Sequence, residues 1–204
     1  MLHDHKIDSV SFGLLRGRYP RLHGKNARRG MHGYGDDIRV VVLRTDQGAE
    51  GFGICPRGPL PDIAGKRVSD LFDPAEGVLE LQYMGYDFAL HDLAGNILGI
   101  SVARMINPAA KPFAKVYDGA IYMNDIIPEH APWGTERVVR EAVDDYEIGH
   151  RTFKIKIGRG NQWMAPEAGI ARDVEVTRAM EEALPGCLLM VDGNDGFTPE
   201  SMIE

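Results

Sequence analysis

The second half of the sequence alternates between short apolar runs and longer amphipathic runs. Strand-like runs occupy residues 115–122, 152–157 and 188–192, and helical runs occupy residues 135–146 and 166–184. Thr198 and Pro199 predict the start of one more helix, because Thr caps helices and Pro suits the first helical position. Strands that alternate with helices are joined by right-handed crossovers and form a parallel sheet covered by helices.

Residues 1–112 follow a different pattern, in which strands come first and helices later. We expect strands at residues 6–15, 38–44 and 51–55, and helices at residues 77–98 and 100–106. This order is typical of an α+β domain. The sequence therefore predicts two domains, residues 1–112 and residues 113–204.

The two long helical runs of the second half each have an apolar face. The positions expected to point inward are Val139, Val143 and Tyr146 in the first run, and Ile170, Val174, Met180 and Leu184 in the second. The acidic residues of the first run are expected on its opposite, solvent-facing side.

Composition narrows the class of protein. Hydrophobic residues make up 44% of the 204 residues and charged residues 26%, which indicates a globular chain. The formal net charge of -7 argues against nucleic acid as a partner. Cys55 and Cys187 form no disulfide framework. No run approaches the ~18 apolar residues of a membrane span, and no signal-peptide pattern opens the chain, so we expect a cytoplasmic protein without a membrane partner.

A pair of lysines lies in the strand-like run at residues 152–157. Lys154 and Lys156 share one face of the strand, and the alternate positions are apolar. Two neighbouring ammonium groups that are partly buried each lower the other's pKa, which would make either lysine a better general base. An ordinary half-exposed strand would show the same alternation. The covered faces of a parallel sheet favour the functional interpretation.

The next strand-like run ends in an acidic residue. Asp192 closes the run Leu-Leu-Met-Val-Asp, and Asn194 follows two positions later. A carboxylate at a strand end suits a hard cation such as Mg²⁺. A simple Asp-Gly turn is the competing interpretation. The segment is not an EF-hand loop, because Gly196 occupies a ligand position and no glutamate follows at the twelfth.

Residues 16–35 are expected to form a glycine-rich basic loop. No acidic residue lies between Asp8 and Asp36, and six cationic side chains fall in this segment. Such a loop favours an anionic ligand, although a mobile solvated loop is equally compatible with it. A small carboxylate substrate fits an otherwise acidic protein better than nucleic acid does. The candidate substrate-binding residues of the loop are Arg16, Tyr19 and Arg21.

Four motifs together resemble one protein family. They are Thr-Asp-Gln-Gly-Ala-Glu-Gly-Phe-Gly at 45–53, Tyr-Met-Gly-Tyr-Asp-Phe-Ala-Leu-His-Asp-Leu-Ala-Gly-Asn at 83–96, Phe-Lys-Ile-Lys-Ile-Gly at 153–158 and Val-Asp-Gly-Asn at 191–194. In this order the chain resembles the mandelate racemase/muconate lactonizing enzyme group of the enolase superfamily. The resemblance implies an α+β capping domain, whose loops close over the substrate, followed by a (β/α) barrel of the TIM type.

The resemblance also implies roles for single residues. Lys156 corresponds to the base that moves the proton α to a carboxylate, and Lys154 to an electrostatic partner beside it. Asp192 corresponds to the first ligand of Mg²⁺, and Asn194 to a neighbouring position that assists metal or substrate. The reaction implied is a dehydration, racemisation or epimerisation, by a lyase or isomerase acting on a carboxylate such as an acid sugar.

The chain departs from the family in what it lacks. A complete barrel takes about 250 residues, whereas residues 113–204 provide only the first three βα units. The family's two further metal-binding carboxylates and its opposing acid/base come from later strands. We therefore expect an incomplete barrel, inactive alone, that assembles as a homo-oligomer or with the missing barrel half. The alternative is a non-catalytic pseudoenzyme or assembly module that retains the capping fold.

Overall fold

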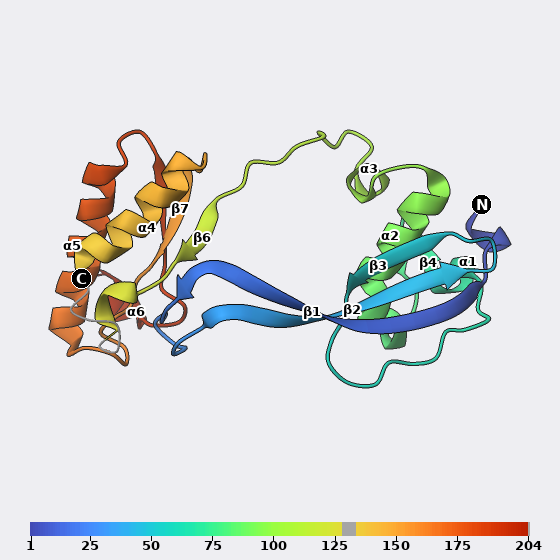
Figure 1. Ribbon diagram of the computed structural model, residues 1–204, viewed down its shortest axis with the longest axis horizontal. Helices are drawn as coiled ribbons and strands as arrows, with labels where there is room; N and C mark the ends of the chain where they lie inside the picture. The colour runs from blue at the N-terminus through green and yellow to red at the C-terminus, as the bar shows by residue number, and fades with distance from the viewer. Residues whose placement is uncertain (128–133, 204) are drawn as a thin grey trace. The chain divides into compact units, whose positions relative to one another are not determined.

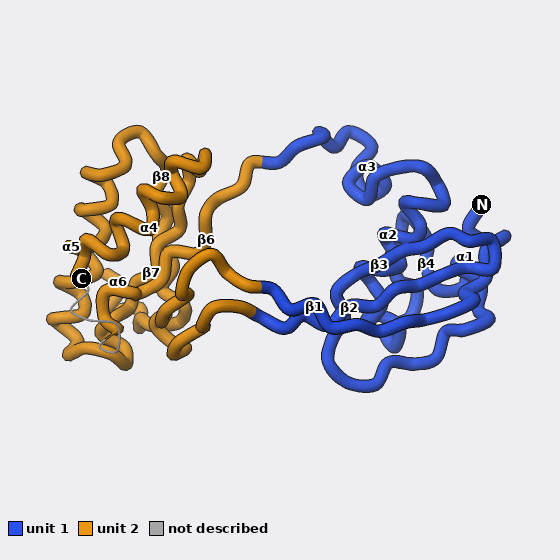
Figure 2. Tube along the Cα trace, viewed as in Figure 1, with its two compact units in different colours: residues 1–17, 36–114 blue, residues 18–35, 115–204 orange. Residues whose placement is uncertain are grey.

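The computed structural model describes residues 1–127 and 134–203. The chain divides into two compact units, residues 1–17 with 36–114 and residues 18–35 with 115–204 (Figure 2). The predicted division near residue 112 assigns residues 18–35 to the first part. In the structure they pack with the second unit instead, because side chains such as Leu22 and Ala27 are buried there.

The first unit combines a sheet with a few short helices (Figure 1). Its elements are η1 (Leu2–Asp4), β1 (Ile7–His23), β2 (Gly33–Thr45), β3 (Glu50–Ile54), α1 (Val68–Leu71), β4 (Phe72–Asp73), β5 (Gly77–Val78), η2 (Leu81–Tyr86), α2 (Asp87–Leu98) and α3 (Val102–Ile106). Residues 18–23 of β1 and 33–35 of β2 belong to the second unit. Strands β1, β2 and β3 form one sheet in that order, with β2 and β3 antiparallel and Val42 opposite Phe52. β4 and β5 form a separate antiparallel pair.

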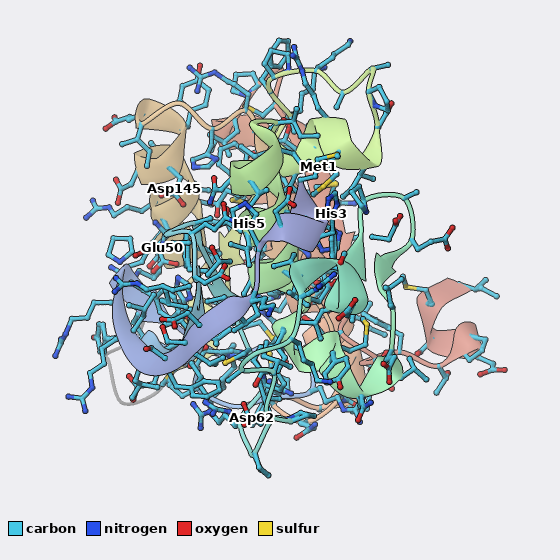
Figure 3. The ribbon with its side chains drawn as sticks, turned by 90° about the vertical axis from the view of Figure 1, so that its right-hand side faces the viewer. Met1, His3, His5, Glu50, Asp62 and Asp145 are labelled. Atoms are coloured by element: carbon cyan, nitrogen blue, oxygen red, sulfur yellow. The ribbon has the colours of Figure 1, made fainter. Side chains whose placement is uncertain are left out.

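Charged groups of neighbouring residues contact one another at the start of the chain. The Met1 ammonium group contacts the Asp4 carboxylate at 2.8 Å, and the His3 ring lies 3.3 Å from the same carboxylate. Figure 3 shows Met1 and His3 side by side at this end of the first unit.

Two expectations for the first unit were wrong. The helix predicted from residue 77 begins ten residues later, because Gly77 and Val78 pair with β4 as β5 and residues 81–86 form the 3-10 helix η2. The segment at 16–35 is not a loop throughout, since β1 continues to His23 and β2 begins at Gly33. Pairing between these strands satisfies their backbone groups although few of their side chains are buried.

The second unit is a parallel sheet covered by helices (Figure 1). Its elements are β6 (Asp118–Ile121), η3 (Asn124–Ile126), α4 (Thr135–Glu147), β7 (Thr152–Lys156), α5 (Pro166–Ala183), β8 (Leu188–Asp192) and α6 (Pro199–Ile203). The strands lie in the order β6-β7-β8 and both pairings are parallel. The predicted alternation is confirmed, and Thr198 caps α6 by accepting the Ser201 N–H at 3.2 Å.

The helix faces differ in part from the expectation. On α5, Met180 and Leu184 are buried as predicted, but Val174 is 43% exposed and Val176 takes its place in the core. On α4 the acidic residues Glu141 and Asp145 are buried, whereas they were expected to face solvent. Their partner is Arg21, which belongs to the same unit. Among the described helices, none has the length and apolar character that a membrane crossing requires.

Candidate active site

The lysine pair lies where the alternation of β7 puts it. Phe153 and Ile155 are fully buried in the core between the sheet and helices α4 and α5, as predicted. Lys154 and Lys156 therefore emerge on the other face of the sheet. Their side chains are 25% and 8% exposed, so the second lysine is the more enclosed of the two.

Asp192 joins both lysines in one cluster. It is the last residue of β8 and stands in register with Lys156, the last residue of β7. The Asp192 Oδ2 atom lies 2.7 Å from the Lys156 Nζ atom and 3.3 Å from the Lys154 Nζ atom. Because the strands are parallel, the cluster lies at the carboxyl edge of the sheet, where active sites of parallel α/β folds are built.

The electrostatics of this cluster differ from the expectation in one respect. Burial raises the pKa of Asp192, but hydrogen bonds from Lys156 and Asn194 outweigh it, and the pKa falls to about 2. The pKa of Lys154 is raised, foremost by its hydrogen bond with the Tyr117 hydroxyl at 3.3 Å and also by Asp192. The predicted lowering of this pKa was wrong for Lys154, because a carboxylate and a phenol offset the repulsion between the ammonium groups.

An aromatic cluster covers Lys156. The Tyr122 ring centroid lies 5.6 Å from the Lys156 Nζ atom. His23 stacks on Tyr122 with centroids 5.0 Å apart, and Tyr19 stacks on His23 at 3.9 Å. The His32 ring contacts Tyr122 from a tilted angle at 4.6 Å. Tyr19, a predicted substrate-binding residue, is thus linked to Lys156 through the rings of His23 and Tyr122.

The predicted site residues did not include four of the residues around the lysines. Tyr117 and Tyr122 flank β6, His23 ends β1, and His32 precedes β2. The tyrosines could have been found, because a strand parallel to β7 brings its own ends level with those of β7. The histidines lie in the segment at 16–35 that was expected to favour an anionic ligand, but which of its side chains reach the lysines depends on the packing of residues 18–35 in the second unit. Burial is the main reason why the pKa of His23 is lowered.

Arg21 has a different environment from the one predicted. Its two terminal nitrogens donate to the two carboxylate oxygens of Asp145. Glu141 lies 3.8 Å from its Nε atom and Asp118 lies 3.9 Å from a terminal nitrogen. The guanidinium group is therefore committed to carboxylates of this protein, and its interpretation as a substrate-binding residue is corrected to an anchor between residues 18–35 and α4.

Two predicted substrate-binding residues remain, Arg16 and Asn194. Arg16 is exposed on β1 in the first unit. Asn194 has φ 44° and donates its backbone N–H to the Asp192 Oδ1 atom at 3.1 Å. Its side-chain Oδ1 atom is buried and has no hydrogen-bond partner within the described part of the chain. Asn194 thus orients Asp192 and keeps one acceptor free.

The cluster provides one suitable ligand for a hard cation. The Asp192 carboxylate is ionised and lies at a strand end, which suits Mg²⁺. Throughout residues 1–127 and 134–203, no three side chains of His, Cys, Asp or Glu come together as a cation site. The described residues therefore fit such an ion only in part.

Comparison with known proteins identifies the fold. Residues 137–204 match the family model described as "Enolase C-terminal domain-like". The structure is similar to galacturonate dehydratase from Geobacillus sp., with a TM-score of 0.84 and 27% identity over 98% of this chain. The resemblance to the mandelate racemase/muconate lactonizing group is confirmed. The L-Ala-D/L-Glu epimerase from Bacillus subtilis shares the enolase-superfamily fold, with a TM-score of 0.68 and 18% identity over 96% of this chain.

The matches cover only part of the related proteins. This chain spans 54% of the galacturonate dehydratase and 55% of the Bacillus epimerase. An L-Ala-D/L-amino acid epimerase from Populus trichocarpa is 34% identical over 56 residues, which are 28% of this chain and 11% of that protein. The dehydratase structure is described as a complex with Mg, and a second structure of it as a complex with D-galacturonate and 5-keto-4-deoxy-D-galacturonate.

Proposed function

We propose that this chain is part of an enolase-superfamily enzyme that moves the proton α to a carboxylate. The observation that carries the proposal is the cluster of Lys154, Lys156 and Asp192 at the carboxyl edge of the parallel sheet. In this proposal Lys156 is the base, because it is the more enclosed lysine and lies at the end of its strand. Lys154 stabilises the developing negative charge from the same face.

Each residue of the cluster has its own role in the proposed reaction. Lys156 Nζ takes the proton from the α carbon, and Asp192, 2.7 Å away, stabilises the ammonium form that results. Return of the proton at the opposite face would complete an epimerisation, whereas loss of a β-hydroxyl group would complete a dehydration. Mg²⁺, when bound with Asp192 among its ligands, would offset the charge that develops on the substrate carboxylate. Tyr122 and His23 exclude water from the base.

The substrate class proposed is an acid sugar. The support is the similarity of the whole chain to galacturonate dehydratase, at a TM-score of 0.84. Dipeptide epimerases share the fold at lower identity, 19% for the enzyme from Methylococcus capsulatus. Dehydration of a sugar carboxylate is therefore favoured over epimerisation of a dipeptide.

The architecture proposed is a capping domain followed by the first three βα units of a barrel. The support is the parallel order β6-β7-β8, with β6 and β8 paired only to β7 among the described strands. With Asp192 as the single candidate carboxylate of the lysine cluster among the described residues, the 204 residues alone are proposed to be inactive. The remaining ligands and the second acid/base would come from further strands or from a partner chain.

Exchange of the α proton with solvent tests the base. Lys156→Ala, introduced in the native gene, should abolish deuterium incorporation into D-galacturonate or a related acid sugar, followed by proton NMR in D₂O. Lys111→Ala, a change at an exposed lysine, should leave the exchange unchanged. Exchange that persists in the Lys156 variant would contradict the assignment of the base.

A second candidate function is a non-catalytic assembly module. The lack of a three-ligand cation cluster within the described ranges favours it over an enzyme that works alone. Absence of exchange in the protein purified with every polypeptide that accompanies it would support the module and contradict the enzyme.

A further inference from the structure

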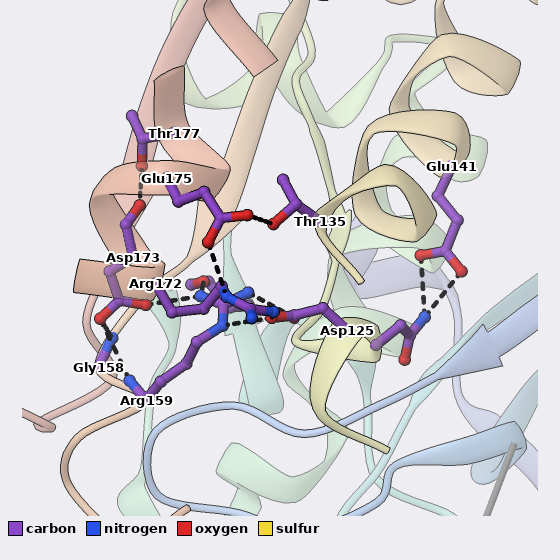
Figure 4. A network of polar contacts seen from close by, with 11 residues as sticks. Asp125, Thr135, Glu141, Gly158, Arg159, Arg172, Asp173, Glu175 and Thr177 are labelled. Carbon is purple, nitrogen blue, oxygen red and sulfur yellow. Dashed lines mark hydrogen bonds and ion pairs between the residues drawn. The ribbon is translucent and has the colours of Figure 1, made fainter. Parts of the chain in front are cut away.

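A buried ionic network lies directly behind the lysine strand. Arg159 is fully buried, and its guanidinium group binds two carboxylates (Figure 4). Its Nε and one terminal nitrogen donate to the two oxygens of Asp125 at 3.0 Å and 2.7 Å. Its other terminal nitrogen donates to Asp173 at 2.6 Å. The network joins the end of β7 to η3 and α5.

The same network also holds the main chain next to Lys156. The terminal nitrogen of Arg159 that binds Asp173 donates to the Lys156 carbonyl oxygen as well, at 3.2 Å. The second oxygen of Asp173 accepts the backbone N–H groups of Gly158 at 2.7 Å and Arg159 at 3.2 Å. Three backbone groups of the segment that leaves β7, the Lys156 carbonyl and the N–H groups of Gly158 and Arg159, are therefore bound by two buried side chains.

The neighbouring backbone contact comes from β8. The Ile157 N–H donates to the Asp192 carbonyl oxygen at 3.1 Å. Gly158 has φ 99°, and a Cβ atom there would lie 2.7 Å from the Cβ atom of Ala27. The chain after Lys156 is thus confined on several sides, so a shift of the network would displace the end of β7.

Packing alone does not require an arginine at this position. A buried guanidinium group loses its hydration and is tolerated only when charged partners and hydrogen bonds replace water. An apolar side chain of similar volume would fill the space but could not bind the Lys156 carbonyl. Arg159 donates hydrogen bonds to the Lys156 carbonyl, beside the proposed base, and to two carboxylates. This arrangement fixes the orientation of the guanidinium group as well as its position.

We propose that Arg159, held by Asp125 and Asp173, is a positioning residue that sets where the Lys156 ammonium group stands relative to Asp192. It acts through the Lys156 main chain and touches neither substrate nor metal. The consequence for catalysis rests on the proposed function, because it requires Lys156 to be the base. The consequence for the geometry of Lys156 does not rest on the proposed function.

The first test measures that geometry without any reaction. Arg159→Lys keeps the positive charge, but an ammonium group cannot bind both carboxylates and the Lys156 carbonyl in the same way. Lysine ammonium signals are recorded by ¹H–¹⁵N NMR of the 204-residue chain, with the Lys156 signal assigned from Lys156→Gln. In Arg159→Lys the Lys156 signal should shift or vanish, while the Lys66 signal of the first unit should not move.

Arg172→Met provides a matched control. Arg172 also pairs with Asp125, at 3.4 Å, and with Glu175 at 3.0 Å, but none of its recorded contacts is with the backbone of residues 156–159. The Lys156 signal should be unchanged in this variant. An unchanged signal in Arg159→Lys, or an equal shift in both variants, would overturn the proposal. So would unfolding of Arg159→Lys while Arg172→Met stays folded, since the arginine would then serve the fold alone.

The second test uses α-proton exchange. Arg159→Lys should lower kcat for exchange on the order of tenfold to a hundredfold, the cost of a misplaced catalytic group, with KM nearly unchanged. A rise in KM at constant kcat would contradict the positioning role. This test uses the protein expressed from the native gene, with every polypeptide that accompanies it. If that protein shows no exchange before any substitution, the proposed function fails, and the NMR measurement still decides the positioning role.

Discussion

At the scale of the residue, the acidic side chains of α4 show how one cation changes the environment of several carboxylates. Asp118, Glu141 and Asp145 surround Arg21, and Asp145 receives both of its terminal nitrogens. Asp145 has a lowered pKa despite partial burial, because Arg21 and Asp118 donate to it. Asp118 shows the opposite shift, since it is buried 3.9 Å from the cation and next to a second carboxylate.

This arrangement predicts a pH dependence of stability. Burial, and then the neighbouring Asp145, raise the pKa of Asp118 to about 6 from an ordinary value of 3.8. The folded chain therefore binds this proton more tightly than the unfolded chain, and this group's contribution to stability is lost as the pH rises from about 4 to 6. Asp118→Asn should remove a decline on the order of 1–2 kcal/mol.

Urea denaturation at pH 4 and pH 7 measures this effect. The free energy of unfolding should fall less between these two values in Asp118→Asn than in the unmodified chain. Asp144→Asn, a change at an exposed position of α4 next to Asp145, should retain the decline. Equal pH dependence in all three proteins would contradict the raised pKa of Asp118.

At the scale of the element, β3 and α2 pack with almost no separation. A Cβ atom on Gly51 would lie 2.4 Å from the Leu93 backbone nitrogen, and one on Gly53 would lie 2.6 Å from that of Ala89. The alternation of β3 places both glycines toward the helix and exposes Phe52. The helix can contact the strand this closely only because the facing positions have no side chain.

Gly51→Ala should therefore separate α2 from the sheet. The added methyl group meets backbone, which cannot rotate away, so we expect a loss on the order of 2–3 kcal/mol in the free energy of unfolding. Gly30→Ala is the matched control, because a Cβ atom there has no neighbour within 4 Å. Thermal unfolding followed by circular dichroism measures both. A variant at Gly51 as stable as the control would show that the approach of α2 is not tight.

Some helices and strands were predicted correctly from the sequence, and others were missed in part. The period of the apolar residues was enough to predict β7 and α5, because each of them buries a face in a single core. The apolar run also predicted β8, although its side chains are half-buried or exposed. The extent of β1 was missed, since its exposed strand is held by backbone pairing rather than by apolar alternation. Burial of the α4 acids was missed as well, because their partner Arg21 is distant in the sequence.

At the scale of the whole molecule, the lysine cluster offers one carboxylate, Asp192, to a cation, and residues 1–127 and 134–203 hold no three-ligand site of His, Cys, Asp or Glu. Mg²⁺ prefers six oxygen ligands and needs further carboxylates, substrate or water to complete them. We therefore expect the isolated chain to bind Mg²⁺ only weakly, with a Kd above about 1 mM, since one carboxylate holds the ion poorly. Asp192→Asn should abolish even this binding.

Isothermal titration calorimetry without substrate measures the affinity. Asp195→Asn, a change at an exposed carboxylate near the end of the same strand, is the control and should leave the weak binding unchanged. Micromolar binding by the chain alone would contradict the proposal that the other ligands come from further strands or from a partner chain.

The sequence by itself determined the alternation of the second unit, the common face of Lys154 and Lys156, and the position of Asp192 at a strand end. These features follow from local periodicity, which is set by residues that are close together in the sequence. Only the tertiary structure decided that residues 18–35 pack with the second unit, that Arg21 serves internal carboxylates, and that Tyr122 and His23 cover the lysines. Each of these depends on contacts between residues that are far apart in the sequence, from Tyr122 with Lys156 to Arg21 with Asp145, and the period of neighbouring residues does not determine such contacts.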